Sequence, residues 1–217
     1  MTRRIPILIY IFLIAFNING GHKAFGQDTT DVQKGVFVSV DVLRPVLNFY
    51  NKDIERYEFG FGIHSYKKYN PAFDFGFANA EFLKSTYSME FSGFYTKLGF
   101  DKVMMQEGKD MLCFGFRLAG SKYNIDYRDA YINDIYFDSI QVDPGSFQPL
   151  AFWAEALFRL NLRLTGNLGF GWAIRFKFPL YMQKDDYFKP FYVPGYGKRQ
   201  SDAMLGFNYY IYYNLPF

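Results

Sequence analysis

AMLGFNYYIYYNLPF, residues 203–217, ends the chain with a strict alternation of side chains. From Phe207 onward every second residue is apolar, and the residues between them include Asn208 and Asn214. Because successive side chains of a β-strand point to opposite faces, this alternation predicts a closing strand with one apolar face. Such a final strand is typical of a bacterial outer-membrane β-barrel.

The N-terminus has the pattern of a secretory signal peptide. Residues 2–4 include two arginines, and residues 5–18 are almost entirely apolar. The apolar run is shorter than the roughly 20 residues of a transmembrane helix, and residues 24–26 (Ala-Phe-Gly) form a small-x-small cleavage pattern. We therefore expect residues 1–26 to be removed and residues 27–217 to form one mature domain, the alternative being an uncleaved anchor.

Composition limits the partners and the compartment. The whole chain has 24 Lys plus Arg against 21 Asp plus Glu, and three of the basic residues and no acid lie in the predicted signal, so the mature chain is neutral. Neutrality argues against nucleic acid as a partner, and we expect outer-membrane lipid instead. The single cysteine, Cys113, excludes an internal disulfide and does not stand at the cleavage point, as a lipid anchor would require.

Alternating segments predict an all-β fold: a single eight-stranded antiparallel up-and-down transmembrane barrel. No later segment approaches 18 consecutive apolar residues, so strands in a closed barrel would have to cross the membrane. The predicted strands are residues 36–47, 56–66, 71–82, 86–103, 111–127, 150–164, 167–182 and 203–217.

The connections suggest which end of the barrel faces outward. Residues 67–70, 106–110 and 165–167 are short and polar, whereas residues 129–149 and 183–202 are long. Short periplasmic turns and long external loops are expected when both termini are periplasmic. The two long segments are therefore predicted to lie at the cell surface.

The two faces of the strands differ in character. One face is an apolar band that includes Phe59, Phe116 and Phe176, and the other mixes charges with glycines such as Gly60 and Gly171. A soluble ligand carrier would turn the apolar face inward. Small residues instead suit the inside of a narrow barrel, where side chains from opposite walls must interleave. We therefore expect the apolar face outward and a filled lumen.

The charged face predicts a network of ion pairs across the lumen. Acidic residues come from the first four strands and basic residues from strands five to seven, with Glu155 as the exception, so one wall should be acidic and the opposite wall basic. A buried charge is tolerable when it is paired, and the alternative is a narrow selective pore lined by the same charges. The predicted network comprises Asp41, Glu58, Asp74, Glu90, Arg117, Glu155, Arg159, Arg163, Arg175 and Lys177.

The fourth strand shows a change of phase. Met89 and Phe91 share one parity, whereas Leu98 and Phe100 share the other, with Gly93 between them. A glycine-centred bulge would absorb the extra residue. The alternative is that one strand ends near Gly93 and a second begins there.

Catalytic and metal sites are limited by the scarcity of histidine. His22 lies in the predicted signal, so a Ser/His/acid site would have to use His64. Cys113 with one histidine provides no zinc site, and no Gly-x-Gly triplet precedes a helical pattern as a phosphate loop would. We expect no catalytic residue, metal or cofactor, and keep a lipid-modifying enzyme using His64 as the alternative.

The long loop 183–202 has the most distinctive amino-acid sequence of the chain. Together with residues 95–101, 152–155 and 209–217, the run Phe188–Arg199 resembles an uncharacterised family of Bacteroidetes outer-membrane β-barrels, a domain of unknown function. The resemblance implies a barrel in the outer membrane and no assigned activity.

Loops on a rigid scaffold often carry function, so we expect a role in surface binding, adhesion or envelope integrity. A narrow-pore channel is a further alternative, and the loop aromatics could instead extend the membrane-interface girdle. The loop candidates are Tyr187, Tyr192, Pro194, Gly195, Tyr196, Gly197 and Lys198.

Overall fold

The computed structural model describes most of the predicted mature domain. The described residues are 35–48, 53–64, 69–84, 87–108, 110–128, 130–132, 140–142, 145–183, 191–198 and 203–216. The predicted signal peptide and the loop candidate Tyr187 lie outside these ranges.

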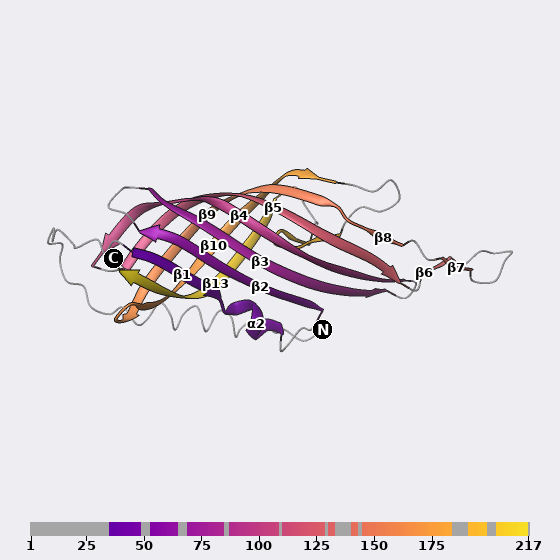
Figure 1. Cartoon of the computed structure of the whole chain (residues 1–217), viewed down its shortest axis with the longest axis horizontal. Helices are drawn as coiled ribbons and strands as arrows, with labels where there is room; N and C mark the ends of the chain where they lie inside the picture. Colours follow the sequence, from indigo (N-terminus) through magenta and orange to yellow (C-terminus); the bar gives the residue numbers. More distant parts are fainter. Residues whose placement is uncertain are drawn as a thin grey trace, which may run out of the picture. The chain divides into compact units, whose positions relative to one another are not determined.

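Eight long strands form a closed antiparallel barrel (Figure 1). Neighbours in the barrel follow chain order, and the last strand pairs with the first. This confirms the predicted all-β, eight-stranded, up-and-down fold. The barrel strands are β1 (Gly35–Asp41), β2 (Ile54–His64), β3 (Tyr69–Lys84), β4 (Tyr87–Glu107), β5 (Asp110–Arg128), β9 (Leu150–Thr165), β10 (Leu168–Met182) and β13 (Met204–Pro216).

The connections divide the barrel into two ends. Three short connections link β2 to β3, β4 to β5 and β9 to β10 at what we call the short-turn end, where Gly108 and Gly166 adopt positive φ. The other connections lie at the loop end. They contain β6 (Ala130–Ile132), β7 (Ile140–Val142), β8 (Ser146–Phe147), β11 (Tyr192–Val193), β12 (Gly197–Lys198) and the helix α2 (Leu43–Asn48).

The first strand is shorter than predicted. The sequence pattern extended it to residue 47, but β1 ends at Asp41 and α2 follows. Pro45 has no N–H for a sheet ladder and fits the first turn of a helix. The Asp41 carboxylate also accepts a hydrogen bond from Leu43 N at 3.0 Å, which turns the chain out of the strand. Among the described residues, no helix has the length and hydropathy of a membrane-crossing helix.

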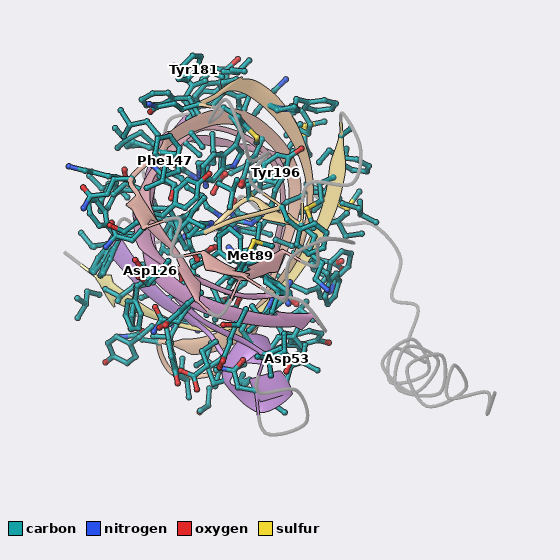
Figure 2. All side chains as sticks on the ribbon, turned by 90° about the vertical axis from the view of Figure 1, so that its right-hand side faces the viewer. Asp53, Met89, Asp126, Phe147, Tyr181 and Tyr196 are labelled. Atoms are coloured by element: carbon teal, nitrogen blue, oxygen red, sulfur yellow. The ribbon has the colours of Figure 1, made fainter. Side chains whose placement is uncertain are left out.

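The apolar face points outward and the charged face inward. Leu98, Leu118 and Phe158 are 63%, 54% and 45% exposed, whereas Arg117 and Glu155 are fully buried. This arrangement is the reverse of a soluble carrier with an apolar interior. Figure 2 views the barrel along its length and shows side chains filling the space inside the ring of strands.

Lumenal glycines lie directly opposite aromatic rings on the neighbouring strands. A Cβ built on Gly171 would come within 2.6 Å of the Tyr210 ring, and one on Gly76 within 2.5 Å of the Tyr95 ring. Gly171 and Tyr210 are register partners, as are Gly76 and Tyr95. Each glycine therefore leaves the space in which a large ring crosses the narrow lumen.

The predicted break in β4 is wrong. Tyr69–Lys84 of β3 pairs with residues 87–102 of β4 without a register shift, so no bulge occurs at Gly93. Met89 and Phe91 are buried on the same inward face as Tyr95 and Lys97. The phase of the strand is constant over residues 87–102, the register shift against β5 lies at Val103/Met105, and the interior itself changes from charged to apolar toward the loop end.

Replacing Gly171 by Val should destabilise the barrel by about 1–3 kcal/mol, because the new side chain overlaps Tyr210 and the carbonyl of Leu160. Urea unfolding of the protein in detergent measures this free energy. The control is Thr96→Val, a near-isosteric change on the exposed outer face of β4. Equal stability of the two variants would contradict the close packing of the lumen.

Candidate functional site

The middle of the lumen holds a cluster of buried charges, which we call the lumenal ion cluster. Its side chains come from every barrel strand except β13 and are all at most 6% exposed. The members are Asp41, Arg56, Glu58, Asp74, Lys97, Asp101, Arg117, Glu155, Arg159, Arg175 and Lys177.

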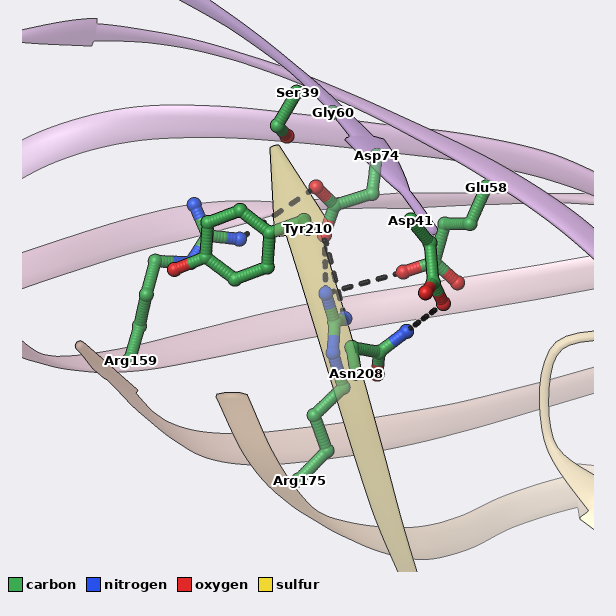
Figure 3. Close-up of a pocket in the computed structure, with 9 residues that line it drawn as sticks. All are labelled: Ser39, Asp41, Glu58, Gly60, Asp74, Arg159, Arg175, Asn208 and Tyr210. Carbon is green, nitrogen blue, oxygen red and sulfur yellow. Dashed lines mark hydrogen bonds and ion pairs between the residues drawn. The ribbon is translucent and has the colours of Figure 1, made fainter. Parts of the chain in front are cut away.

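Arg175 of β10 connects three walls of the barrel. Its Nη1 lies 2.8 Å from Glu155 Oε2 of the adjacent β9 and 3.3 Å from Asp74 Oδ2 of β3. Its Nη2 lies 3.1 Å from Glu58 Oε1 of β2. Figure 3 shows this guanidinium directed between Asp74 and Glu58. One side chain thus bridges strands that are far apart in the sheet.

A second group of ion pairs lies nearer the short-turn end. Arg117 Nη2 and Arg159 Nη1 lie 2.8 Å and 3.3 Å from the two oxygens of Asp101. Asp74 joins the two groups, because its Oδ2 lies 3.4 Å from Arg117 Nε and 3.3 Å from Arg175 Nη1. The charges are therefore shared among several partners, which offsets the cost of their desolvation.

Lys97 contacts two of the carboxylates that Arg175 also contacts, Glu58 and Glu155. Its Nζ lies 2.9 Å from Glu58 and 3.4 Å from Glu155, so it faces two acids at once. Tyr95 donates its hydroxyl proton to Glu58 Oε2 at 2.8 Å. Trp153 donates its indole N–H to Glu155 Oε1 at 2.8 Å. Neutral donors therefore complete the coordination of both carboxylates.

The predicted network residues meet in the lumen with two exceptions. Glu90 lies on the outward parity of β4, opposite Glu81 and Asp126, and Arg163 lies at the short-turn end, where it donates to Asn167 Oδ1 at 3.0 Å. The structure brings together Asp41, Glu58, Asp74, Arg117, Glu155, Arg159, Arg175 and Lys177.

Sequence reasoning missed three members of the cluster: Arg56, Lys97 and Asp101. Lys97 and Asp101 share the parity of Tyr95, which the supposed break at Gly93 concealed. Arg56 shares the parity of Glu58 and was detectable from alternation alone. Because Arg56 and Lys97 come from β2 and β4, the predicted division into an acidic and a basic wall is wrong.

The space left within the cluster is very small. A cavity of about 10 Å³, about the room of one water molecule, lies among the residues drawn in Figure 3. Its lining includes Ser39, Gly60, Asn208 and Tyr210 beside the charged side chains. Ion pairs and hydrogen bonds therefore occupy this level of the lumen, and little room remains for a ligand.

Residues 192–198, which we call the cap, fold back into the loop end of the barrel. Tyr192 and Tyr196 are almost fully buried, and Figure 2 shows Tyr196 inside the ring of strands. Tyr196 packs edge-on against Trp153 with ring centroids 5.9 Å apart. Gly195 has a φ of +80°, and a Cβ there would come within 2.5 Å of the Tyr95 ring. Close packing and backbone conformation both require glycine at this position.

Lys177 attaches the cap to the lumenal ion cluster. Its Nζ donates to the carbonyl oxygens of Gly195 at 2.6 Å and Tyr196 at 3.0 Å, and lies 4.0 Å from Glu155. The hydrogen-bond acceptors of this buried ammonium group are therefore two backbone carbonyls, with the Glu155 carboxylate farther away. Charge-assisted hydrogen bonds of this kind are the stronger ones in proteins.

The cap corrects the expectation of a displayed loop. Tyr192, Pro194, Gly195 and Tyr196 are buried, Gly197 is half-buried, and Lys198 is exposed. Lys198 lies over the rings of Phe82 and Phe191 at 5.2 Å and 5.8 Å. The aromatic side chains are buried because the lumen at this level is lined by apolar residues, including Met89, Phe91 and Ile125.

His64 lies at the short-turn end. It is buried against Phe37, with ring centroids 4.7 Å apart, and neither ring nitrogen has a hydrogen-bond partner among the described residues. A Ser/His/acid site requires the histidine to contact both a nucleophile and an acid. Within the described part of the chain that contact set is not assembled, nor does any group of acids, histidines or cysteines have the arrangement of a metal site.

A family model matches nearly the whole sequence. The family is described as "Domain of unknown function (DUF6048)", and the match covers residues 2–217. The chain belongs to this family. Comparison with curated proteins and with solved structures gave no match. Membership of the DUF6048 family agrees with the resemblance to an uncharacterised family, whereas an origin in Bacteroidetes stays a prediction.

Replacing Arg175 by Met should lower the free energy of unfolding by about 3–5 kcal/mol, because Asp74, Glu58 and Glu155 lose a shared cation in a buried site. Urea unfolding in detergent provides the measurement. The control is Lys122→Met on the exposed outer face of β5, which should change stability by less than about 0.5 kcal/mol. A water-filled lumen would tolerate both substitutions equally.

Replacing Lys177 by Met should loosen the cap, since the carbonyls of Gly195 and Tyr196 lose their charged donor. Trypsin should then cut the folded protein after Lys198 roughly tenfold faster, as the loss of about 1.4 kcal/mol of local stability implies. Lys122→Met removes the same charge elsewhere and should leave the rate unchanged. Equal cleavage rates in all three proteins would mean that Lys177 does not hold the cap.

Proposed function

We propose that this DUF6048 protein is an integral outer-membrane β-barrel of a Gram-negative bacterium, with a sealed lumen and a role in surface binding or envelope integrity. The observation that carries the proposal is the outward apolar belt on a closed barrel. Lipid provides no hydrogen-bond partners for the backbone, so closed barrels and helices are the structures that cross it. A belt of exposed Leu, Phe and Ile around a charged interior is the reverse of a soluble protein.

On β2 to β5 the polarity of the outer face changes toward the loop end. Tyr57, Phe77 and Phe94 form an outward aromatic row across β2, β3 and β4. The next outward row toward the loop end is polar and runs across β2 to β5: Glu55, Asn79, Ser92 and Asn124. Aromatic residues followed by polar ones are typical of the edge of a transmembrane barrel.

The interior changes in the opposite sense at the same level. The next inward row, on the loop side of the polar outward row, is apolar: Ile54, Ala80, Phe91 and Ile125. An apolar inside with a polar outside is the arrangement of a protein in water, whereas the middle of the barrel has a charged inside and an apolar outside. The reversal supports a membrane around the middle and water around the loop end.

A sealed lumen favours a structural or binding role over conduction. The lumenal ion cluster fills the middle, and the cap fills the loop end with aromatic side chains. Eight strands leave no room for an aqueous channel beside these groups. Because the cap is buried, surface recognition would belong to the β5–β9 connection, which carries the β6–β7 hairpin (Figure 1).

A pair of arginine substitutions tests the membrane proposal. Leu118→Arg places a charge in the belt and should impair insertion by about 2–4 kcal/mol, whereas Asn124→Arg in the polar row should cost no more than about 1 kcal/mol. Both positions are exposed on the outer face of β5, so a soluble barrel would accept either change. Folding into lipid vesicles, followed by the mobility shift between unboiled and boiled samples, is the measurement.

The native protein should also fractionate with outer membranes and produce no current steps in a planar bilayer. Recovery in the soluble periplasmic fraction would overturn the proposed location. A reproducible conductance would overturn the sealed lumen and leave the location standing.

A further inference from the structure

The barrel wall has a notch at the loop end, between β2 and β13. β1 pairs with both strands only as far as Asp41, whereas β2 and β13 continue beyond it. Among the described residues, Ile54–Glu58 and Met204–Asn208 have no ladder partner on the side where β1 has ended. Unpaired strand edges beside an apolar belt are costly unless another element covers them.

Helix α2 occupies the notch. Val42 N donates to Tyr209 O at 2.8 Å as the chain leaves β1, and α2 then lies beside β2 and β13 (Figure 1). Val46 and Leu47 of α2 are 53% and 41% exposed. Leu205 of β13, an element that α2 contacts, is also exposed. The helix therefore presents exposed apolar side chains at the loop end of the barrel.

The inner side of the notch carries two arginines and two carboxylates, those of Asp41 and Glu58. Arg56 of β2 is 6% exposed, and its Nη2 lies 3.4 Å from Asp41 Oδ2. That carboxylate also accepts hydrogen bonds from Asn208 and from the backbone N–H of Leu43, so it is shared among three donors. Asp41 therefore has little capacity left for a second guanidinium.

Arg44 of α2 is the second guanidinium. The like charge of Arg56 and partial burial lower the pKa of Arg44, and the opposing influence of Asp41 does not compensate. The Nε atoms of both arginines are buried and have no hydrogen-bond partner among the described residues. Within the described part of the chain, two neighbouring guanidinium groups therefore each keep a free N–H donor, and the carboxylates that attract them, Asp41 and Glu58, are shared with other donors and cations.

We propose that the outer rim of this notch binds the phosphate group of a membrane lipid, with the half-buried Arg44 as the phosphate ligand and the buried Arg56 as a positive charge behind it. The inference deepens the proposed function and rests on it, since the lipid comes from the surrounding leaflet. Guanidinium groups match phosphate oxygens through paired, charge-assisted N–H donors. The exposed Val46 and Leu47 select a lipid over free phosphate, because an acyl chain can lie against them while the headgroup meets Arg44.

Two acidic residues oppose an anion at this place. Asp53 and Glu55 lie at the start of β2 and are exposed, whereas Arg56 points inward. The headgroup would therefore approach from the side of α2. Glu55→Gln, which removes one repulsive charge, should tighten binding.

The test uses the full mature protein in detergent, with bisphosphorylated lipid A as the probe and native mass spectrometry to measure bound lipid. The wild-type protein should bind this probe at least about tenfold more tightly than the same lipid without phosphates. Arg44→Gln should remove most of that difference, and Arg44→Lys should retain part of it. Lys122→Gln, the matched loss of a positive charge on β5, should bind like the wild type.

Three results would overturn the proposal: equal affinity for the two lipids, unchanged affinity in Arg44→Gln, or inorganic phosphate that binds as tightly as the lipid. The last result would assign the site to the free ion. Arg56→Gln adds support only if the variant keeps the heat-dependent mobility shift, because it also breaks the pair with Asp41. Loss of that shift in the wild type would refute the membrane barrel itself, which separates the two failures.

Discussion

Pairing of charges inside a narrow, closed barrel is the constraint on which the rest of the structure depends. Asp74 illustrates it, because arginines from β5, β9 and β10 all lie within 4 Å of its carboxylate oxygens. Such sharing requires long side chains to cross from one wall to the other. Glycines on the inward face leave the space that these long side chains need. The small residues and the paired charges of the inward face therefore depend on each other.

The same constraint explains the contrast between the two halves of the lumen. In the middle of the barrel, the outer surface is apolar, and the charged side chains of the strands lie inside the lumen. Toward the loop end, the outward row on β2 to β5 is polar, and the cap completes an apolar core with Trp153, Phe91 and Ile125. Lys177 is the junction, since its ammonium group lies near Glu155 and donates to backbone carbonyls of the cap. The cap and the ion cluster thus stabilise each other.

Alternation of side chains was sufficient to predict the number of strands, their order and the face that points inward, because the backbone period of two holds through the middle of the barrel and the register shifts lie near strand ends. Alternation shows which residues share a face, but it does not show whether that face packs against water, lipid or protein. The apolar residues around Met89 therefore indicate a change of phase in the sequence, although they line an apolar part of the interior. The cap was hidden for a related reason: aromatic residues such as Tyr192 suit a membrane interface and a buried core equally. The local pairing of Arg56 with Asp41 required knowledge of where β1 ends.

The seam between β1 and β13 has consequences for the order of assembly. It joins the two ends of the barrel domain in seven register pairs, whereas β4 and β5 are consecutive and share a much longer ladder. Hairpins form with little loss of loop entropy, and closure of the seam requires the whole intervening chain to be ordered. Closure of the seam therefore costs more loop entropy than any hairpin, and Asp41, at the end of the seam, meets Asn208 of β13 only when these two strands are paired. The hydrogen bond that fixes this carboxylate at the notch thus depends on a closed barrel.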